Sequence, residues 1–95
     1  MKAYEEFIKS HNLVNRLYNM SHYFNLDEDD EEKEKIIKRF FKYNLGNAEY
    51  VELLAKYLDD KKLRCTKNIE LYFNLKELID DLNYLKQYIL FENEE

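Results

Sequence analysis

The C-terminal quarter of the chain carries the pattern that most restricts its fold. Between residues 68 and 91, six large aliphatic side chains recur at alternating steps of four and three. This leucine seam consists of Leu71, Leu75, Leu78, Leu82, Leu85 and Ile89. Residues with this spacing share one side of an α-helix. We therefore predict a helix over residues 68–91, capped by Asn68 and buried along the seam.

The start of this helix has an alternative interpretation. Residues near 62–73 can instead pair as a short hairpin, and Asn74 with Glu77 would then form a capping box for a shorter helix. The chain would in that case be a winged-helix-like α+β protein. We favour the long helix, because Leu71 continues the seam and because this segment has no Gly for a two-residue hairpin turn.

The composition favours helices throughout the chain. A chain of 95 residues without Pro and with a single Gly offers few of the turn residues that an all-β fold needs. Nine Tyr and six Phe supply enough large apolar groups to offset the entropy cost of folding. In a small domain, such a seam packs against sibling helices more often than it drives a coiled coil. We therefore expect a single all-α domain over residues 1–95, a small four-helix bundle with a long C-terminal helix, and leave dimerisation open.

The first helix is expected to begin near Lys2 and to bend or break near residues 10–12. Its apolar residues fall on two different stripes, so the buried face changes direction there. The first stripe contains Tyr4, Phe7, Ile8, His11, Val14 and Tyr18, and the second contains Leu13, Leu17, Met20 and Phe24. Either Ser10 or Asn12 can act as a local cap at this break.

Two shorter helices are predicted in the middle of the chain, joined at Gly46. We expect the first to end at Leu45, with Gly46 in the left-handed conformation that ends many helices. Its buried face would contain Ile36, Ile37, Phe40 and Phe41. The second helix would begin with Asn47 as its N-cap. Its buried face would contain Val51, Leu54, Ala55 and Leu58.

An acidic run occupies residues 27–34, where seven carboxylates accompany one lysine. Asp27 can cap the following helix, and the next acids suit the positive end of its dipole. The remaining carboxylates form either a solvated surface or a docking surface for a basic partner. The acidic residues that we single out as candidate partner contacts are Asp27, Glu28, Asp29, Asp30, Glu31 and Glu32.

Basic residues gather in two blocks, at 35–42 and 61–67. Their members are Lys35, Lys38, Arg39, Lys42, Lys61, Lys62, Arg64 and Lys67. Cations late in a helix are favoured by the negative end of its dipole, which explains Arg39 and Lys42 without any ligand. If the fold placed both blocks on one face, they would form a nucleic-acid-binding surface even in a protein with a net charge of −5.

The end of the C-terminal helix carries more apolar surface than the seam needs. Tyr84, Tyr88 and Phe91 form a second stripe beside it. The first helix could cover this stripe within the monomer. Alternatively, a partner protein or a second copy could bind there, since aromatic side chains are favoured at interface centres. Both alternatives remain open.

No catalytic or metal-binding pattern is recognisable in the chain. His11 and His22 would lie about 16 Å apart on a continuous helix, too far to share a metal. Cys65 has no second cysteine and no neighbouring His, so a buried or half-buried structural cysteine is expected. A lone Gly46 cannot build a phosphate-binding loop. We therefore expect no enzymatic activity, no cofactor and no metal.

The N-terminal residues lack a signal-peptide pattern, and no apolar run approaches the length of a membrane span. We therefore expect a cytoplasmic protein that does not bind membranes. By elimination, the predicted function is that of a small acidic module that binds and occludes another protein with a basic surface. Examples are a phage-type inhibitor of a nucleic-acid-binding protein and an immunity or antitoxin-like neutraliser. The alternative is nucleic-acid binding through the two basic blocks.

Overall fold

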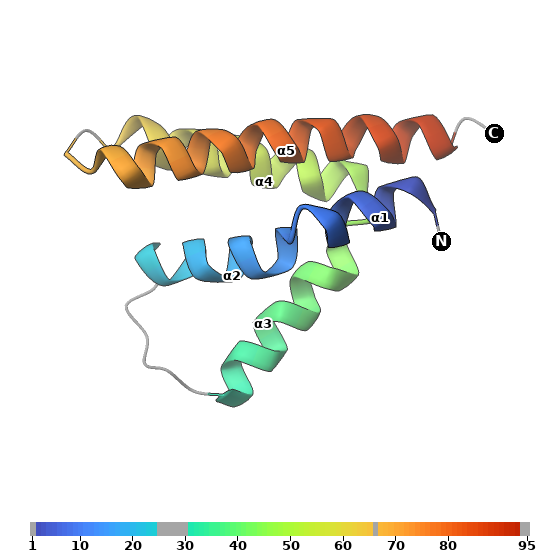
Figure 1. Cartoon of the computed structure of the whole chain (residues 1–95), viewed down its shortest axis with the longest axis horizontal. Helices are drawn as coiled ribbons and strands as arrows, with labels where there is room; N and C mark the ends of the chain where they lie inside the picture. Colours follow the sequence, from blue (N-terminus) through green and yellow to red (C-terminus); the bar gives the residue numbers. More distant parts are fainter. Residues whose placement is uncertain (1, 25–30, 66, 94–95) are drawn as a thin grey trace.

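The computed structural model describes residues 2–24, 31–65 and 67–93. These residues form five helices and contain no strand: α1 (Ala3–Ser10), α2 (Leu13–Phe24), α3 (Glu31–Asn44), α4 (Ala48–Leu63) and α5 (Ile69–Asn93). The predicted all-α bundle with a long C-terminal helix is therefore confirmed (Figure 1). The alternative hairpin near residues 62–73 is wrong, because α4 continues to Leu63 and α5 already begins at Ile69.

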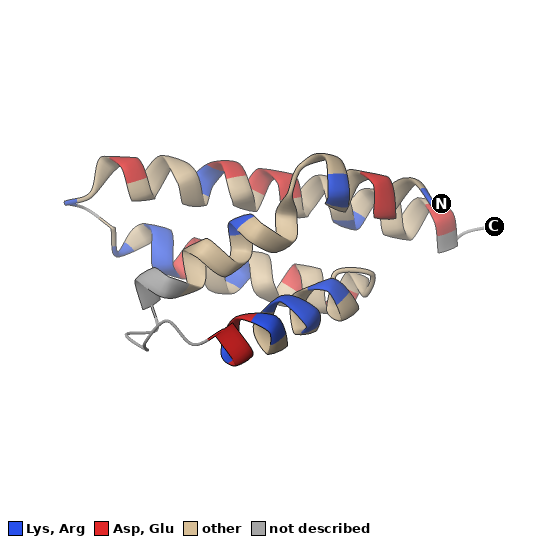
Figure 2. Ribbon diagram, turned by 60° about the horizontal axis from the view of Figure 1, so that its bottom comes forward, with Lys and Arg blue, Asp and Glu red and all other residues tan. Residues whose placement is uncertain are grey.

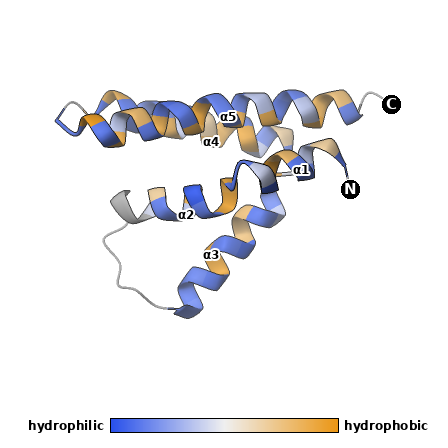
Figure 3. Ribbon diagram, viewed as in Figure 1, coloured by the Kyte–Doolittle hydropathy of each residue, from blue (hydrophilic) through white to orange (hydrophobic). Residues whose placement is uncertain are grey.

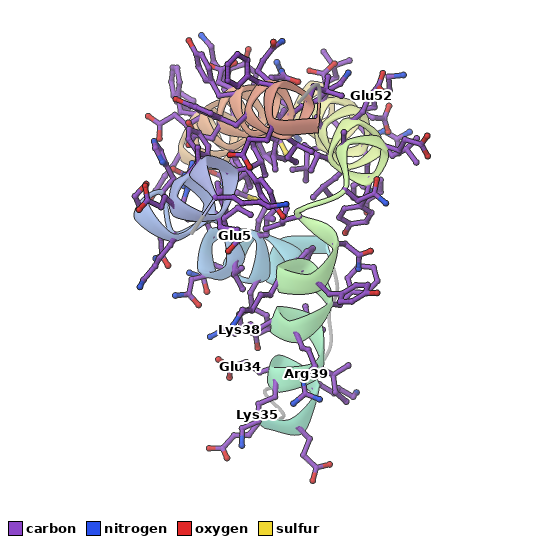
Figure 4. All side chains as sticks on the ribbon, turned by 90° about the vertical axis from the view of Figure 1, so that its right-hand side faces the viewer. Glu5, Glu34, Lys35, Lys38, Arg39 and Glu52 are labelled. Atoms are coloured by element: carbon purple, nitrogen blue, oxygen red, sulfur yellow. The ribbon has the colours of Figure 1, made fainter. Side chains whose placement is uncertain are left out.

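Helices α4 and α5 form an antiparallel pair that supplies most of the core (Figures 1 and 4). All six residues of the leucine seam are buried, and α4 contributes Val51, Ala55 and Leu58 to the same cluster. Burying one Leu or Ile stabilises the fold by about 1.5–3 kcal/mol, so this pair dominates the packing energy. The predicted cap of α5 is confirmed, because Asn68 Oδ1 accepts a hydrogen bond from the Leu71 amide at 3.0 Å.

The predicted break in the N-terminal helix is also confirmed, and it divides the segment into α1 and α2. Asn12 adopts a left-handed conformation with a φ of 52°, which Asn tolerates better than most residues. The amides of His11 and Asn12 close the end of α1 by donating to the carbonyls of Phe7 and Lys9. The change of direction lets α1 pack against α5 while α2 packs between α3 and α5.

Helix α3 is less covered than its sequence pattern predicts. Phe41 is buried and Ile37 is half-buried, but Ile36 is 66% exposed and Phe40 is 51% exposed. The prediction that α3 buries all four residues is therefore wrong for Ile36 and Phe40. The physical reason is that α3 packs on α2 along one side and then extends away from the other helices (Figures 1 and 4). Figure 3 shows most of α3 as hydrophilic, interrupted by hydrophobic bands.

The connection between α3 and α4 differs from the prediction in one respect. Gly46 does not adopt the left-handed conformation, since no glycine in the described chain has a positive φ. A Cβ atom on Gly46 would instead lie 3.2 Å from Cε2 of Tyr4, so a close approach of α1 explains this glycine. The predicted N-cap is confirmed, because Asn47 Oδ1 accepts hydrogen bonds from the amides of Glu49 and Tyr50 at 3.0 and 3.2 Å.

Polar contacts hold the N-terminal helices against α5. Arg16 Nη1 of α2 lies 2.6 Å from Oδ2 of Asp81 on α5, and it also donates to the His11 carbonyl at 3.0 Å. At the start of α1, the Tyr4 amide donates to Glu92 Oε1 at 3.0 Å. Lys2 is the N-cap residue of α1, but its side chain makes no capping hydrogen bond. Glu92 caps the helix instead, by accepting the hydrogen bond of a free amide in the first turn.

Candidate partner-binding surfaces

The side of α5 opposite the leucine seam carries exposed aromatic residues at both ends and acidic residues between them. We call this surface the outward face of α5; its residues are Phe73, Glu77, Asp80, Tyr84, Tyr88 and Phe91. The spacing of three and four residues places them on one side of the helix. Figure 2 shows acidic residues along much of α5. The sequence pattern identified the aromatic residues from position 84 onward, whereas Phe73 and the intervening acids were not recognised as part of the same face.

The C-terminal end of this face is covered by α1 only in part. The rings of Phe7 on α1 and Tyr88 on α5 have centroids 5.3 Å apart, so α1 contacts one side of the aromatic stripe. Tyr84 remains 63% exposed and Phe91 remains 68% exposed. Of the two alternatives from the sequence, cover by α1 is therefore confirmed only for Tyr88. Binding of a partner to the exposed Tyr84 and Phe91 remains a prediction.

The other end of α5 forms a shallow hollow with the end of α4. Its volume is about 510 Å³, and its walls are Lys62, Leu63, Cys65, Ile69, Tyr72 and Phe73. Cys65 is half-buried in this hollow, as the sequence predicted. The Lys62 ammonium lies 5.8 Å from the centroid of the Tyr72 ring and 3.1 Å from Oδ1 of Asp59. This hollow extends the apolar part of the outward face beyond Phe73.

The acidic run does not join the aromatic residues of α5 in one surface. Asp27, Glu28, Asp29 and Asp30 lie outside the described residues. Glu31 and Glu32 are exposed in the first turn of α3, where the helix dipole favours negative charge. The start of α3 lies far from the end of α5 that carries Phe91 (Figure 1). A docking role of the acidic run remains a prediction.

The two basic blocks lie on different elements. Lys35, Lys38, Arg39 and Lys42 lie along α3, whereas Lys61, Lys62, Arg64 and Lys67 lie at the end of α4 and in the connection to α5 (Figures 2 and 4). Several of these cations have local acidic partners. Lys38 lies 2.8 Å from Glu34 Oε1, and Arg64 lies 3.4 Å from Asp60 Oδ2. Exposed pairs of this kind reduce the charge available to a nucleic acid while adding little stability.

A larger groove lies between α1, the break at Asn12 and the second half of α3. It has a volume of about 860 Å³. The apolar, aromatic and basic residues that line it include Tyr4, Ile8, Lys9, Arg39, Lys42 and Tyr43. The sequence pattern did not indicate this site, because α1 and α3 are distant in sequence and line the groove together only in the folded chain. No local spacing in the chain could have indicated it.

Two residues of α4 have pKa values shifted from their usual range. The Lys86 ammonium, 3.2 Å from Glu52 Oε2, and then Lys56 hold the pKa of Glu52 below its usual range. Burial raises the pKa of Tyr50. Within residues 2–24, 31–65 and 67–93, no three His, Cys, Asp or Glu side chains are grouped to hold a metal ion.

None of the described helices combines the length and the apolar character needed to cross a membrane. Comparisons of the chain with protein-family models, curated protein sequences and solved structures give no match. The geometry of the exposed surfaces is therefore the basis for a functional proposal.

Proposed function

We propose that this protein is an acidic protein-binding module that acts by occupying a basic surface on another protein. The observation that carries the proposal is the exposure of Tyr84 and Phe91 on the outward face of α5. Aromatic side chains are enriched at the centres of protein interfaces, where their burial supplies much of the binding energy. Two large aromatic groups within two turns of one helix form an anchor of this kind.

The charges on the same face select the partner. Glu77 and Asp80 lie between the two aromatic ends, are exposed, and have no ion-pair partner among the described residues. Lys76 flanks them, so the middle of the face has a small negative balance. Together with the net charge of −5, this favours approach to a basic partner. A helix with cations between two apolar groups would match the face in both respects.

A different protein fits this face better than a second copy. Pairing the outward face of α5 with itself would place Glu77 and Asp80 of both copies in one interface. Like charges in contact are unfavourable and serve to suppress wrong partners. The homodimer is therefore the weaker proposal, although it would also bury the aromatic side chains.

The proposed mode of action is occlusion. A module that covers a basic, nucleic-acid-binding surface of its target inhibits that target without any chemistry of its own. A phage-type inhibitor and an immunity or antitoxin-like neutraliser both act in this way, and we place the activity in the cytoplasm. The acidic run at residues 27–34 would then add long-range attraction to the same target.

The proposal is tested by quantitative affinity capture followed by binding measurements with the purified partner. We expect the Tyr84→Ala/Phe91→Ala variant to lose a partner that wild type retains. Leu53→Ala is the matched control, because Leu53 is equally exposed on α4, away from this face. With the isolated partner, the double variant should bind at least about tenfold more weakly by calorimetry, equivalent to about 1.4 kcal/mol.

Charge reversal separates the electrostatic part of the proposal from the apolar part. Glu77→Lys/Asp80→Lys should slow association and reduce its dependence on salt. If both double variants bind the partner as wild type does, the outward face of α5 is not the interface. A salt-dependent gel shift with nucleic acid, lost on charge reversal of the basic blocks, would instead support the nucleic-acid alternative.

A further inference from the structure

The groove between α1 and α3 is a second concave surface, separate from the outward face of α5. One wall is α1, with Tyr4, Ile8 and Lys9, and the other is α3, with Arg39, Lys42 and Tyr43. Figure 4 shows α3 descending from the other helices, with Arg39 along it and Glu5 of α1 above. Its volume of about 860 Å³ falls in the range of sites that hold a ligand of moderate size.

The groove has a basic rim. Lys9 approaches from α1, while Arg39 and Lys42 lie one turn apart on α3. In the described part of the chain, none of these three cations has a carboxylate within ion-pair distance. Cations that converge without acidic partners favour an anionic ligand, and Arg adds planar bidentate recognition of carboxylates.

The floor of the groove is apolar. Ile8 and Val14 line it, and Gly46 leaves room for the ring of Tyr4, which approaches to 3.2 Å from where a Cβ atom would lie. Tyr43 stands at the edge and is 86% exposed. A ligand that satisfied only the cations would leave this apolar surface in contact with water. The site therefore favours a ligand that carries an apolar group between its negative charges.

We propose that this groove binds a short acidic peptide segment of another protein, with one Leu or Phe side chain inserted against Ile8 and Val14. The carboxylates of the segment pair with Lys9, Arg39 and Lys42. Glu5, which also lines the groove and has no ion pair among the described residues, accepts a hydrogen bond from the peptide backbone. Recognition of acidic motifs by clustered cations is a recurring mode of peptide binding.

A nucleic acid fits the same groove less well. Glu5 would repel a continuous row of phosphates, whereas a peptide backbone offers N–H groups to it. The net charge of −5 opposes the approach of a polyanion more strongly than that of a short segment with a few carboxylates. Tyr43 and Tyr4, whose ring packs against Gly46, provide less stacking surface than the successive aromatic groups on which single strands bind.

The test uses an acetylated eight-residue peptide with Asp and Glu around a central Phe, titrated by fluorescence anisotropy and by amide NMR shifts. We expect saturable binding with shifts confined to α1, the turn at Asn12 and the second half of α3. The Arg39→Glu/Lys42→Glu variant should bind at least about tenfold more weakly. Lys33→Glu/Lys35→Glu is the matched control, because it makes the same charge change on α3 outside the groove, and it should change affinity much less.

Each contrary result has a defined meaning. No binding at about 1 mM peptide, or equal losses in both charge-reversal variants, would overturn the proposal. Equal binding of a peptide with Ala in place of Phe would show attraction to charge alone and would also overturn it. Tighter binding of a single-stranded oligonucleotide, lost in the Arg39→Glu/Lys42→Glu variant, would assign the groove to nucleic acid. Concentration-dependent self-association lost in that variant would assign it to a second copy.

The outcome of the peptide-binding test does not depend on the function proposed for the outward face of α5. Tyr84→Ala/Phe91→Ala should leave affinity for the acidic peptide unchanged, because neither residue lines the groove. Circular dichroism at 222 nm verifies that each variant retains its helix content before its binding is interpreted.

Discussion

Helices α5 and α3 both carry an apolar stripe at helical spacing, but the two stripes have different surroundings. The stripe of α5 is buried along its whole length against α4, α1 and α2. The stripe of α3 packs mainly on α2, with a ring contact between Phe40 and Tyr50 of α4, and Phe41 is its one buried residue in the described chain. Two helices with similar patterns therefore differ in how much they stabilise the fold. An apolar stripe shows which side of a helix is suited to burial, and the tertiary structure decides whether another helix packs on that side.

The two regions therefore have different roles in the molecule. The α4–α5 pair carries most of the core and presents the exposed aromatic residues of the outward face of α5. Helix α3 contributes little to the core and leaves its cations and Tyr43 beside a groove. In a domain whose total stability is about 5–15 kcal/mol, weakly packed elements open first and often carry binding functions.

The largest expected difference between the two regions concerns packing. Leu82→Ala, in the centre of α5, should lower the free energy of unfolding by about 3–4 kcal/mol, because it leaves a cavity in the core. Ile36→Ala on α3 is the control and should cost less than about 1 kcal/mol, since its side chain is mostly solvated. Urea denaturation followed by circular dichroism measures both. Similar losses would mean that Ile36 is covered in solution.

The next effect concerns the ion pair that joins α2 to α5. Helix α2 is also the helix on which α3 packs. Asp81→Asn should lower the free energy of unfolding by about 1–2 kcal/mol, because it removes a charged acceptor 2.6 Å from Arg16 in a half-buried site. Arg16→Gln and the double variant complete a thermodynamic cycle. A coupling energy near zero would show that this ion pair is solvated and that packing alone joins the two regions.

A smaller effect is expected at the junction of α3 and α4. Gly46→Ala should cost up to about 1 kcal/mol, because the Tyr4 ring must move away from the new methyl group. In a Tyr4→Ala background the same change should be neutral or stabilising, since Ala reduces the entropy of the unfolded chain and the glycine has no positive φ. Thermal unfolding of the four proteins checks this. Equal costs in both backgrounds would contradict the close approach of Tyr4.

The smallest effect is a pH dependence at Tyr50, whose ring lies against Phe40 of α3 with centroids 5.6 Å apart. Burial raises the pKa of Tyr50 above its usual value of 10.0, so the folded state holds the phenol proton more tightly than the unfolded state. This contribution is complete below pH 10 and is lost as pH rises through the folded-state pKa. Wild type should therefore lose more stability than Tyr50→Phe between pH 9 and 11 in denaturant titrations. Parallel pH profiles would place the Tyr50 hydroxyl in water.

Local patterns predicted the features that depend on neighbouring residues. The leucine seam identified α5, the change of stripe located the break near Asn12, and the amide side chains of Asn47 and Asn68 marked the starts of α4 and α5. Each of these depends on spacing within one or two turns of helix, which is visible in the sequence.

The remaining features depend on contacts between distant segments. The exposure of Phe40 depends on the angle at which α3 leaves α2, and the need for Gly46 depends on a ring that arrives from α1. The groove exists because the fold brings Lys9 and Arg39 to the same site, although they are 30 positions apart in the sequence. Spacing within a helix contains no information about such angles, so neither the groove nor the exposed side of α3 could be inferred from the chain alone.

The hydrogen bond from the Tyr4 amide to Glu92 spans 88 positions, from the first turn of α1 to the last turns of α5. On the ribosome, α1 emerges before α5, and its N-terminal cap arrives only when synthesis of α5 is almost complete. Contacts of such sequence separation are slow to form, and chains that wait for them expose apolar surface in the meantime. The first turn of α1 in the nascent chain therefore lacks this cap until the last turns of α5 have left the exit tunnel.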